Sequence, residues 1–253
     1  MPANTNLLTD GYWMLFADNN NGTPSVAATI KIGGAMIDVA SPELGTTMWL
    51  EQDARHLGAN VLPSNGFTLT GDYINQVGAI MGEQEIDLTK SFDLKFSVLL
   101  GNNASPGDGM AFVLQNDELG KNAIGGAGTS LGAVGIKNGI GIAFSSDTND
   151  HTDFFATDPS SEQPLLSASN AVTLSDAKLH AADVSWNSAT QTLSYIIDGQ
   201  KEGSLTGNLA ATYFGGSSQV YFGFTAATGT HAALHEVELT SFTGALVTPV
   251  ARL

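Results

Sequence analysis

One stretch of the chain gathers carboxylates and carries no cationic side chain. Between Lys137 and Lys178 there is no Lys or Arg, and the window holds six acidic residues: Asp147, Asp150, Asp153, Asp158, Glu162 and Asp176. Carboxylates at such short spacing repel one another unless a cation lies among them. Residues 147–153 crowd oxygen-bearing side chains together, as Ca²⁺ requires. The pattern indicates a calcium loop; the alternative is a solvated acidic loop.

A second candidate is the glycine-rich segment 125–128, in which only residue 127 carries a side chain. Glycine lets the backbone approach a ligand closely and donate N–H groups to it. A phosphate-binding loop would close with Gly-Lys-Ser/Thr, which is missing here. A calcium-binding nonapeptide repeat would supply Asp, which is also missing. The segment therefore predicts either a ligand-facing loop or a flexible surface loop.

The composition excludes several classes of partner. The chain has 253 residues, with 25 acidic against 9 basic side chains and a net charge of −16. Nucleic acid and anionic membranes need clustered cations, so neither is expected to bind. No apolar run is long enough to insert in a membrane, and with no Cys there is no disulfide framework. No signal peptide is visible, which fits a cytosolic protein or a fragment of an exported chain. The composition favours an extracellular location.

Period-two alternation predicts an all-β fold that must position these residues. Residues 92–98 alternate apolar and polar side chains, as a strand with one buried face does. Further strands are expected at 181–186, 192–197, 220–224 and 237–242, with a hairpin turn at Asp198-Gly199. A short helix is predicted at Leu209–Tyr213, and Trp186 is assigned to the core. So many strands favour antiparallel sheets in two layers.

The first part of the chain differs in pattern from the rest. Strand-like runs occur at 13–16 and 27–32, and Pro-Ser-Asn-Gly at 63–66 makes a natural break. The predicted organisation is a small N-terminal β annex over 1–62, a β-sandwich over 63–245 and a tail over 246–253. Trp13 and Trp49 lie in the annex and are left unassigned.

From Gly66 to Phe242 the order of sequence blocks resembles the L-type (legume-like) lectin domain, in its bacterial branch. Residues 107–112 are similar to that family's Ala-Asp-Gly-Leu-Ala-Phe motif, and 125–132 to its glycine-rich sugar loop. Residues 222–229 resemble its Phe-Ser-Ala-Ala-Thr-Gly segment, and 67–72 and 86–92 resemble its first strand blocks. The resemblance implies a concanavalin A-like antiparallel β-sandwich (jelly roll), as found in large secreted or surface adhesins.

The resemblance also implies a shallow sugar site in loops at one end of the sandwich. Asp108 stands at the acid of the first motif, where a carboxylate accepts two sugar hydroxyls in charge-assisted hydrogen bonds. The loop that follows Ala-Thr-Gly sets monosaccharide preference in the family. For each residue the alternative is an ordinary loop or turn position. The predicted sugar-contacting residues are Asp108, Gly126, Gly128, Asn149, Gly229, Thr230 and His231.

Metal binding is implied as well, but the sequence departs from the family pattern. The family carries Glu-Phe-Asp-Thr, then Asn, then Asp and His, which together hold Ca²⁺ and a transition metal. Here Ala143 and Ser145 stand at the two acids, so two ligands are lost and the transition-metal site is not expected. A single remodelled Ca²⁺ site is predicted instead, with the ligands Asp147, Asn149, Asp150 and His151.

The predicted function is non-catalytic, calcium-dependent binding of cell-surface or environmental glycans by an extracellular or surface-anchored module of a larger adhesin. One alternative is a structural or peptide-binding adhesin module that has lost sugar binding. Another is a glycoside hydrolase, whose retaining pair needs Glu-x-Asp-x-x-Glu. In the nearest match, which begins at Glu85, Lys90 occupies the second acid's position. We therefore expect no enzyme.

Overall fold

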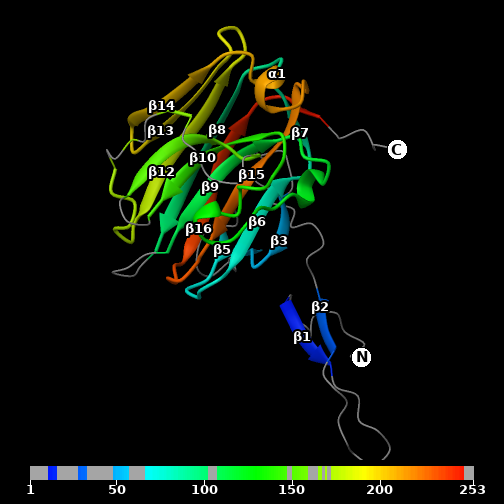
Figure 1. Ribbon diagram of the computed structural model, residues 1–253, viewed down its shortest axis with the longest axis vertical. Helices are drawn as coiled ribbons and strands as arrows, with labels where there is room; N and C mark the ends of the chain where they lie inside the picture. Colours follow the sequence, from blue (N-terminus) through cyan, green and yellow to red (C-terminus); the bar gives the residue numbers. More distant parts are fainter. Residues whose placement is uncertain are drawn as a thin grey trace, which may run out of the picture. The chain divides into compact units, whose positions relative to one another are not determined.

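The computed structural model describes residues 11–15, 28–32, 48–56, 66–101, 107–146, 150–158, 165–166, 169 and 172–247 (Figure 1). Contacts divide the chain into two units, Met1–Ile37 and Asp38–Leu253. The first contains an antiparallel hairpin of β1 (Gly11–Leu15) and β2 (Ala28–Ile32), in which Trp13 pairs with Ile30. Both strands fall on the strand-like runs that the sequence indicated.

The second unit contains two antiparallel sheets. The larger has the order β11-β10-β9-β15-β6-β3, with β7 and β17 extending from β15. Its strands are β3 (Met48–Gln52), β6 (Val77–Gly82), β7 (Glu85–Asp87), β9 (Gly109–Gln115), β10 (Gly139–Ser145), β11 (His151–Ala156), β15 (Gln219–Ala227) and β17 (Leu246–Val247). The other sheet has the order β14-β13-β12-β8-β16-β5-β4. Its strands are β4 (Arg55–His56), β5 (Gly66–Thr70), β8 (Phe92–Leu100), β12 (Leu179–Asn187), β13 (Thr192–Ile197), β14 (Gln200–Thr206) and β16 (His235–Thr243).

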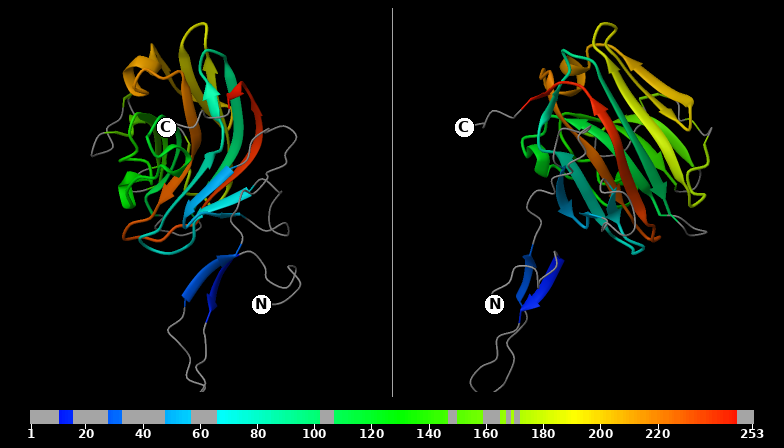
Figure 2. Two further views of the ribbon diagram at one scale, coloured as in Figure 1. Left: turned by 90° about the vertical axis from the view of Figure 1, so that its right-hand side faces the viewer. Right: turned by 180° about the vertical axis from the view of Figure 1, so that it is seen from behind.

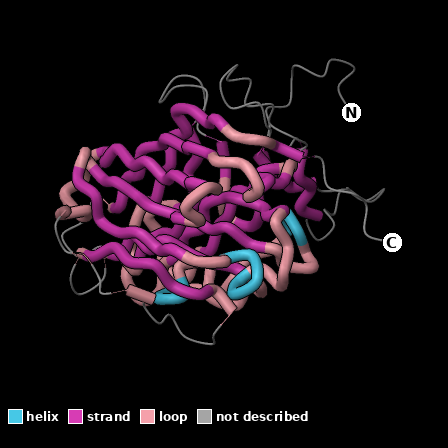
Figure 3. The backbone as a smooth tube through the Cα atoms, turned by 90° about the horizontal axis from the view of Figure 1, so that it is seen from above, coloured by secondary structure: helices cyan, strands magenta, loops and turns pink. Residues whose placement is uncertain are grey.

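This arrangement confirms the predicted antiparallel β-sandwich. Burial along β8 alternates between buried and accessible residues, as its sequence requires for a strand with one face on the core. Asp198 and Gly199 have φ of 49° and 80° and turn β13 into β14. In Figure 3 the short helices lie outside the stacked strands. They are α1 (Leu209–Tyr213), which is the predicted helix, and the 3₁₀ turns η2 (Gly120–Asn122) and η3 (Gly128–Ser130).

Aromatic side chains fill the space between the sheets. The ring centroids of Phe96 and Phe224 lie 4.6 Å apart, and those of Phe112 and Phe224 lie 5.5 Å apart, both edge to face. Such pairs contribute about 0.5–1.5 kcal/mol each beyond their buried area. Trp186 is 5% exposed and its Nε1–H donates to the Leu88 carbonyl at 2.8 Å, which confirms its assignment to the core.

A second apolar cluster lies on the opposite face of the larger sheet. It joins sheet residues such as Ala111, Ala143 and Phe155 to Leu131 and Val134 of the segment between β9 and β10. Figure 2, left, shows these green loops covering one face of that sheet. The buried residues flank the glycine-rich segment, in which Gly126 and Ala127 are themselves exposed.

Residues 48–56, which the sequence analysis placed in the annex, contribute to the sandwich. Strand β3 pairs with β6 from Met48↔Gly82 onward, and β4 pairs with β5 through Arg55↔Thr68. At the other end, β17 pairs with β7 through Leu246↔Ile86. The predicted domain limits at 62 and 245 stay predictions about domain organisation. No helix in the described part of the chain has the length and apolar character needed to cross a membrane.

Candidate functional site

Asp108 lies in a turn that leads into β9 and is hydrogen-bonded to the end of β10. Its carbonyl oxygen accepts hydrogen bonds from the Ser146 amide at 3.1 Å and the Ser145 hydroxyl at 3.3 Å. The Ser146 hydroxyl donates to the Gly107 carbonyl at 2.7 Å. Three hydrogen bonds thus fix the backbone of Gly107 and Asp108, and Asp108 itself is half-buried.

Two glycines from distant segments lie against that carboxylate. A Cβ on Gly229 would lie 3.0 Å from Asp108 Oδ2, and one on Gly128 would lie 3.7 Å from Oδ1. The two glycines also contact each other, since the Gly229 Cβ would lie 3.3 Å from the Gly128 Cα. No hydrogen bond from a described residue reaches the carboxylate oxygens. The structure therefore brings Asp108, Gly128 and Gly229 together around the two carboxylate oxygens.

Gly126 lies apart from this group. A Cβ there would meet the Ser130 hydroxyl at 3.1 Å, and its N–H donates to the Val134 carbonyl at 3.0 Å. The Gly132 amide donates back to the Gly126 carbonyl at 2.9 Å. Both backbone groups of Gly126 thus serve to shape the loop. Gly128, with φ of +64°, starts η3 and is the glycine of this loop that reaches the acid.

The loop after β15 is joined to the turn between β5 and β6. Thr228 is fully buried and its hydroxyl donates to the Tyr73 carbonyl at 2.8 Å while accepting from the Gln76 amide at 2.9 Å. The Asn75 amide donates to the Gly229 carbonyl at 3.1 Å. Beyond Gly229, Thr230 and His231 are exposed, and the Thr230 hydroxyl lies 3.4 Å from His231 Nδ1. These two predicted residues lie at the rim of the group.

Sequence reasoning missed Tyr73 and Ile74 on the neighbouring turn. Their side chains are 69% and 56% exposed, which is unusual for an adjacent aromatic and aliphatic pair. No motif marks them, because their sequence reads as the end of a strand block. Only the hydrogen bonds between this turn and residues 228–229 place the pair beside the acid.

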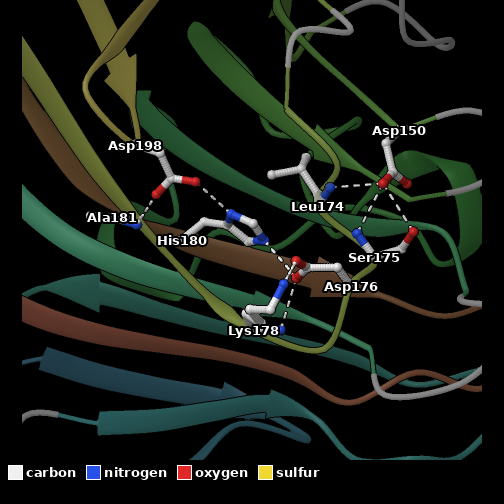
Figure 4. Close-up of polar contacts among 8 residues, drawn as sticks. All are labelled: Asp150, Leu174, Ser175, Asp176, Lys178, His180, Ala181 and Asp198. Carbon is white, nitrogen blue, oxygen red and sulfur yellow. Dashed lines mark hydrogen bonds and ion pairs between the residues drawn. The ribbon is translucent and has the colours of Figure 1, made fainter.

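Of the four predicted calcium ligands, Asp147 and Asn149 lie outside the described residues. Asp150 has another task, shown in Figure 4: its Oδ2 accepts from the Leu174 amide at 2.7 Å and from the Ser175 amide and hydroxyl, both at 2.9 Å. The fourth ligand, His151, is half-buried on β11, opposite Ser145. The contacts of Asp150 therefore show it anchoring the segment that leads into β12.

Figure 4 also shows that this segment is held from its other side by His180. His180 Nε2 lies 3.1 Å from an Asp176 oxygen and Nδ1 lies 2.7 Å from an Asp198 oxygen. The second Asp198 oxygen accepts from the Ala181 amide at 2.9 Å. Several acids of the cation-free window and its flank are thus used as hydrogen-bond acceptors that organise a loop.

The described residues do not reproduce the two-metal set that the resemblance implies. Ala143 and Ser145 present a methyl group and a hydroxyl on β10 where two carboxylates are expected. Within the described ranges, no three His, Cys, Asp or Glu side chains gather as a metal site needs. One buried acid nevertheless has no hydrogen-bond partner among the described residues. Asp153 is 2% exposed, its burial raises its pKa to about 6, and the nearby His151 acts in the opposite direction.

The acid pair of a retaining hydrolase is not formed in the segment that begins at Glu85. Glu85 is buried in β7, while Asp87 Oδ1 accepts from the Thr89 amide at 2.9 Å and hydroxyl at 2.7 Å. Lys90 is exposed. Asp87 thus acts as a turn residue.

Curated relatives match only part of the chain. The chain is 38% identical over 89 residues to the "Serine-rich adhesin for platelets" of Staphylococcus aureus (strain MRSA252). The matched segment makes up 34% of this chain and 6% of the adhesin. The "Pesticidal crystal protein Cry22Aa" of Bacillus thuringiensis is 30% identical over 86 residues, which is 34% of this chain and 12% of that protein. The chain thus spans a small share of the relatives it matches.

Solved structures resemble the sandwich over most of its length. A peanut lectin with a 9-residue peptide has a TM-score of 0.62 at 19% identity, covering 80% of this chain and 93% of that one. A Bauhinia forficata lectin in complex with GalNAc has a TM-score of 0.62 at 17% identity, covering 79% and 93%. These likenesses confirm the fold. The family model of the legume lectin beta-barrel domain matches residues 46–241, and the chain belongs to this L-type lectin family.

Proposed function

We propose that the chain is a non-catalytic carbohydrate-binding module whose principal sugar contact is the Asp108 carboxylate. The observation that carries this is the position of Gly128 and Gly229 against the two carboxylate oxygens. Because neither glycine has a side chain, a ligand can approach a carboxylate whose backbone is fixed and which accepts no hydrogen bond from described residues. Hydroxyl pairs of a pyranose are donors that match the two oxygens, and a charge-assisted bond is stronger than a neutral one.

Other predicted contacts surround this centre. Thr230 and His231 supply a hydroxyl and an imidazole at the rim. We propose Asn149 as a further sugar-contacting residue. Tyr73 adds an exposed aromatic ring on the turn that binds to residues 228–229. An aromatic face packs against the C–H face of a sugar. The proposed site is therefore an open rim around one acid, which suits weak single-sugar binding strengthened by multivalency.

The comparisons support the class of ligand and the setting. The family is one of lectins, and solved relatives are described as complexes with GalNAc, galactose or Tn-antigen. A partial relative is an adhesin. We propose that the chain acts in adhesion, as an extracellular or cell-surface module of a larger bacterial adhesin that binds glycans or glycoconjugates.

The proposal includes calcium dependence, with residues 147–151 as the loop that binds the cation. Asp150 Oδ2 already accepts three hydrogen bonds, so its Oδ1 is the oxygen that remains for a cation. The proposed Ca²⁺ ligands are Asp147, Asn149, Asp150 Oδ1 and His151. A cation there would stabilise the loop that follows Ser146, which donates to the Asp108 carbonyl and so connects the loop to the sugar site.

The experiment is a glycan array probed with the protein in calcium and in chelator, using wild type, Asp108→Asn and Asp93→Asn. Asp93 makes a surface ion pair with Lys95 on the other sheet and serves as the matched control. We expect glycan signals that the control retains and Asp108→Asn loses. Equal signals from Asp108→Asn and wild type would refute the site. Signals unaffected by chelator would remove calcium from the proposal.

A structural or peptide-binding adhesin module is the second candidate. The methyl and hydroxyl groups of Ala143 and Ser145, in place of two carboxylates, favour it. An array with no glycan signal in either condition would select this candidate, and cleavage of an oligosaccharide would select an enzyme.

A further inference from the structure

His180 is a buried imidazole whose two ring nitrogens both face carboxylates. Its side chain is 7% exposed, with Nδ1 at 2.7 Å from an Asp198 oxygen and Nε2 at 3.1 Å from an Asp176 oxygen. Figure 4 shows the ring between the two acids. A neutral imidazole has one N–H and one lone pair, so it can donate to only one carboxylate. Both hydrogen bonds therefore form only when the ring is protonated and charged.

The ring connects three parts of the chain. His180 lies near the start of β12, Asp198 follows β13 at the turn into β14, and Asp176 belongs to the segment that leads into β12. On β8, the residue opposite His180 is Val98, which carries no charge. Lys178 is 74% exposed at its side chain and pairs with Asp176. The charged groups that face the ring in these elements are thus two carboxylates, one of which also has a cation beside it.

Asp176 is an ionised acceptor in this arrangement. Its pKa is lowered, chiefly by the hydrogen bond from the Lys178 side chain and also by that from His180, while desolvation acts in the opposite direction. The Lys178 amide donates to Asp176 Oδ1 at 3.0 Å, and this is the same oxygen that faces His180 Nε2. Asp176 therefore ties the end of segment 174–178 to the ring, and Asp150 holds the beginning of that segment.

We propose that Asp176, His180 and Asp198 form a pH-sensitive latch that fixes residues 174–178 when the ring is charged. The contact with Asp198 is the shorter one, so the neutral ring keeps its hydrogen on Nδ1. The Nε2 lone pair then faces Asp176 Oδ1, and two acceptors repel each other. Histidine is the side chain that changes charge near neutral pH. In alkaline solution the latch therefore opens on the Asp176 side and stays closed on the Asp198 side.

This inference does not rest on the sugar proposal, and its test uses neither glycan nor metal. NMR signals of the His180 ring nitrogens are recorded at pH 5.5 and 8.5, on either side of the ordinary imidazole range. We expect hydrogen on both nitrogens at the lower pH and on Nδ1 alone at the higher pH. Amide exchange of residues 174–178, corrected for intrinsic rates, should show about fivefold or greater protection at pH 5.5, because a hydrogen bond to a charged group is lost at pH 8.5.

Variants assign the pH difference to the latch. His180→Gln should remove the difference and leave protection at the wild-type value for pH 8.5. Asp176→Asn should also remove it, because an amide accepts from the charged ring and donates to the neutral one. His231→Gln, which alters an exposed histidine, and Asp153→Asn, which alters a buried acid whose pKa of about 6 lies in the same range, should both keep it.

Four results would overturn the proposal. The first is a His180 ring with hydrogen on only one nitrogen at pH 5.5, and the second is equal wild-type protection of residues 174–178 at both pH values. The third is a pH difference that persists in His180→Gln. The fourth is its loss in His231→Gln or Asp153→Asn, which would assign the difference to another titrating group.

Discussion

Gly229 faces Asp108 so closely that a single added methyl group would lie 3.0 Å from the carboxylate oxygen Oδ2. The two residues are 121 positions apart and come from different loops. A glycine in this place leaves Oδ2 free of the methyl group that any other residue would bring against it. The relationship makes the proposed site unusually sensitive to one small substitution.

Gly229→Ala should reduce glycan affinity at least tenfold while leaving the fold intact. The methyl group would cover Oδ2 and press on Gly128, whose Cα lies 3.3 Å from the added Cβ. Affinity measured by calorimetry or on an array, together with Tm, checks this. Gly126→Ala is the matched control, because the atoms nearest to its methyl group belong to Ser130 and Val134 and not to Asp108. A Gly229→Ala protein that binds normally would disprove the placement of the ligand.

Tyr73→Ala should weaken binding of oligosaccharides several-fold and binding of single sugars less, because its ring lies at the rim and not at the acid. Stacked aromatic contacts contribute about 0.5–1.5 kcal/mol. Leu119→Ala, which removes another apolar side chain that is 62% exposed, is the control. If both substitutions lower affinity equally, the effect is not specific to the rim.

His235 should make the fold less stable in acid. Complete burial lowers its pKa to about 4, against an ordinary 6.5, and only the Gly107 backbone acts in the opposite direction. As the pH falls, the His235 imidazole is therefore protonated in the unfolded chain before it is protonated in the folded protein. Stability is complete above about pH 6.5 and falls as the pH decreases towards 4, by up to about 3 kcal/mol.

Denaturant unfolding at pH 7.5 and 4.5 measures that loss. His235→Gln retains a group that can bond to Thr70, which lies 2.7 Å from His235 Nδ1, but does not titrate. Its stability should change less between the two pH values than that of wild type. An equal loss in both proteins would assign the acid sensitivity to other groups.

Asp150→Ala should destabilise the segment around Leu174 and Ser175 whether or not calcium is present. It removes three hydrogen bonds to one carboxylate oxygen, and bonds to charged groups contribute about 1.5–3 kcal/mol each. Hydrogen exchange at residues 174–178 and denaturant unfolding report the effect, with Asp158→Asn as control. A defect that appears only with calcium would show that cation binding is the main role of Asp150.

The sequence predicted the sandwich well because its signals are local. Alternation along β8, the Asp198-Gly199 turn and the Leu209–Tyr213 helix each depend on a few neighbouring residues. The helix is also fixed locally, since the Asn208 side chain accepts from the Ala211 amide at 3.1 Å. Ordered motifs then identified the family.

The site was harder to predict because its geometry depends on contacts between distant segments. Gly126 and Gly128 look alike in sequence, yet only Gly128 reaches Asp108. Tyr73 is connected to the site only through the hydrogen bond that its carbonyl accepts from the Thr228 hydroxyl. Asp153 lies opposite Ala143 because of the register between β10 and β11, and a run of acidic residues in the sequence does not reveal that register.

Strand β15 lies in the middle of the larger sheet, between β9 and β6, and ends at Ala227, just before the loop that faces Asp108. The turn of Asp108 in turn leads directly into β9. Non-local strand pairing of this kind forms slowly in folding, because long loops must close first. The acid and its facing glycine therefore meet only when the centre of the sheet has assembled. The proposed site is therefore complete only in the assembled sandwich.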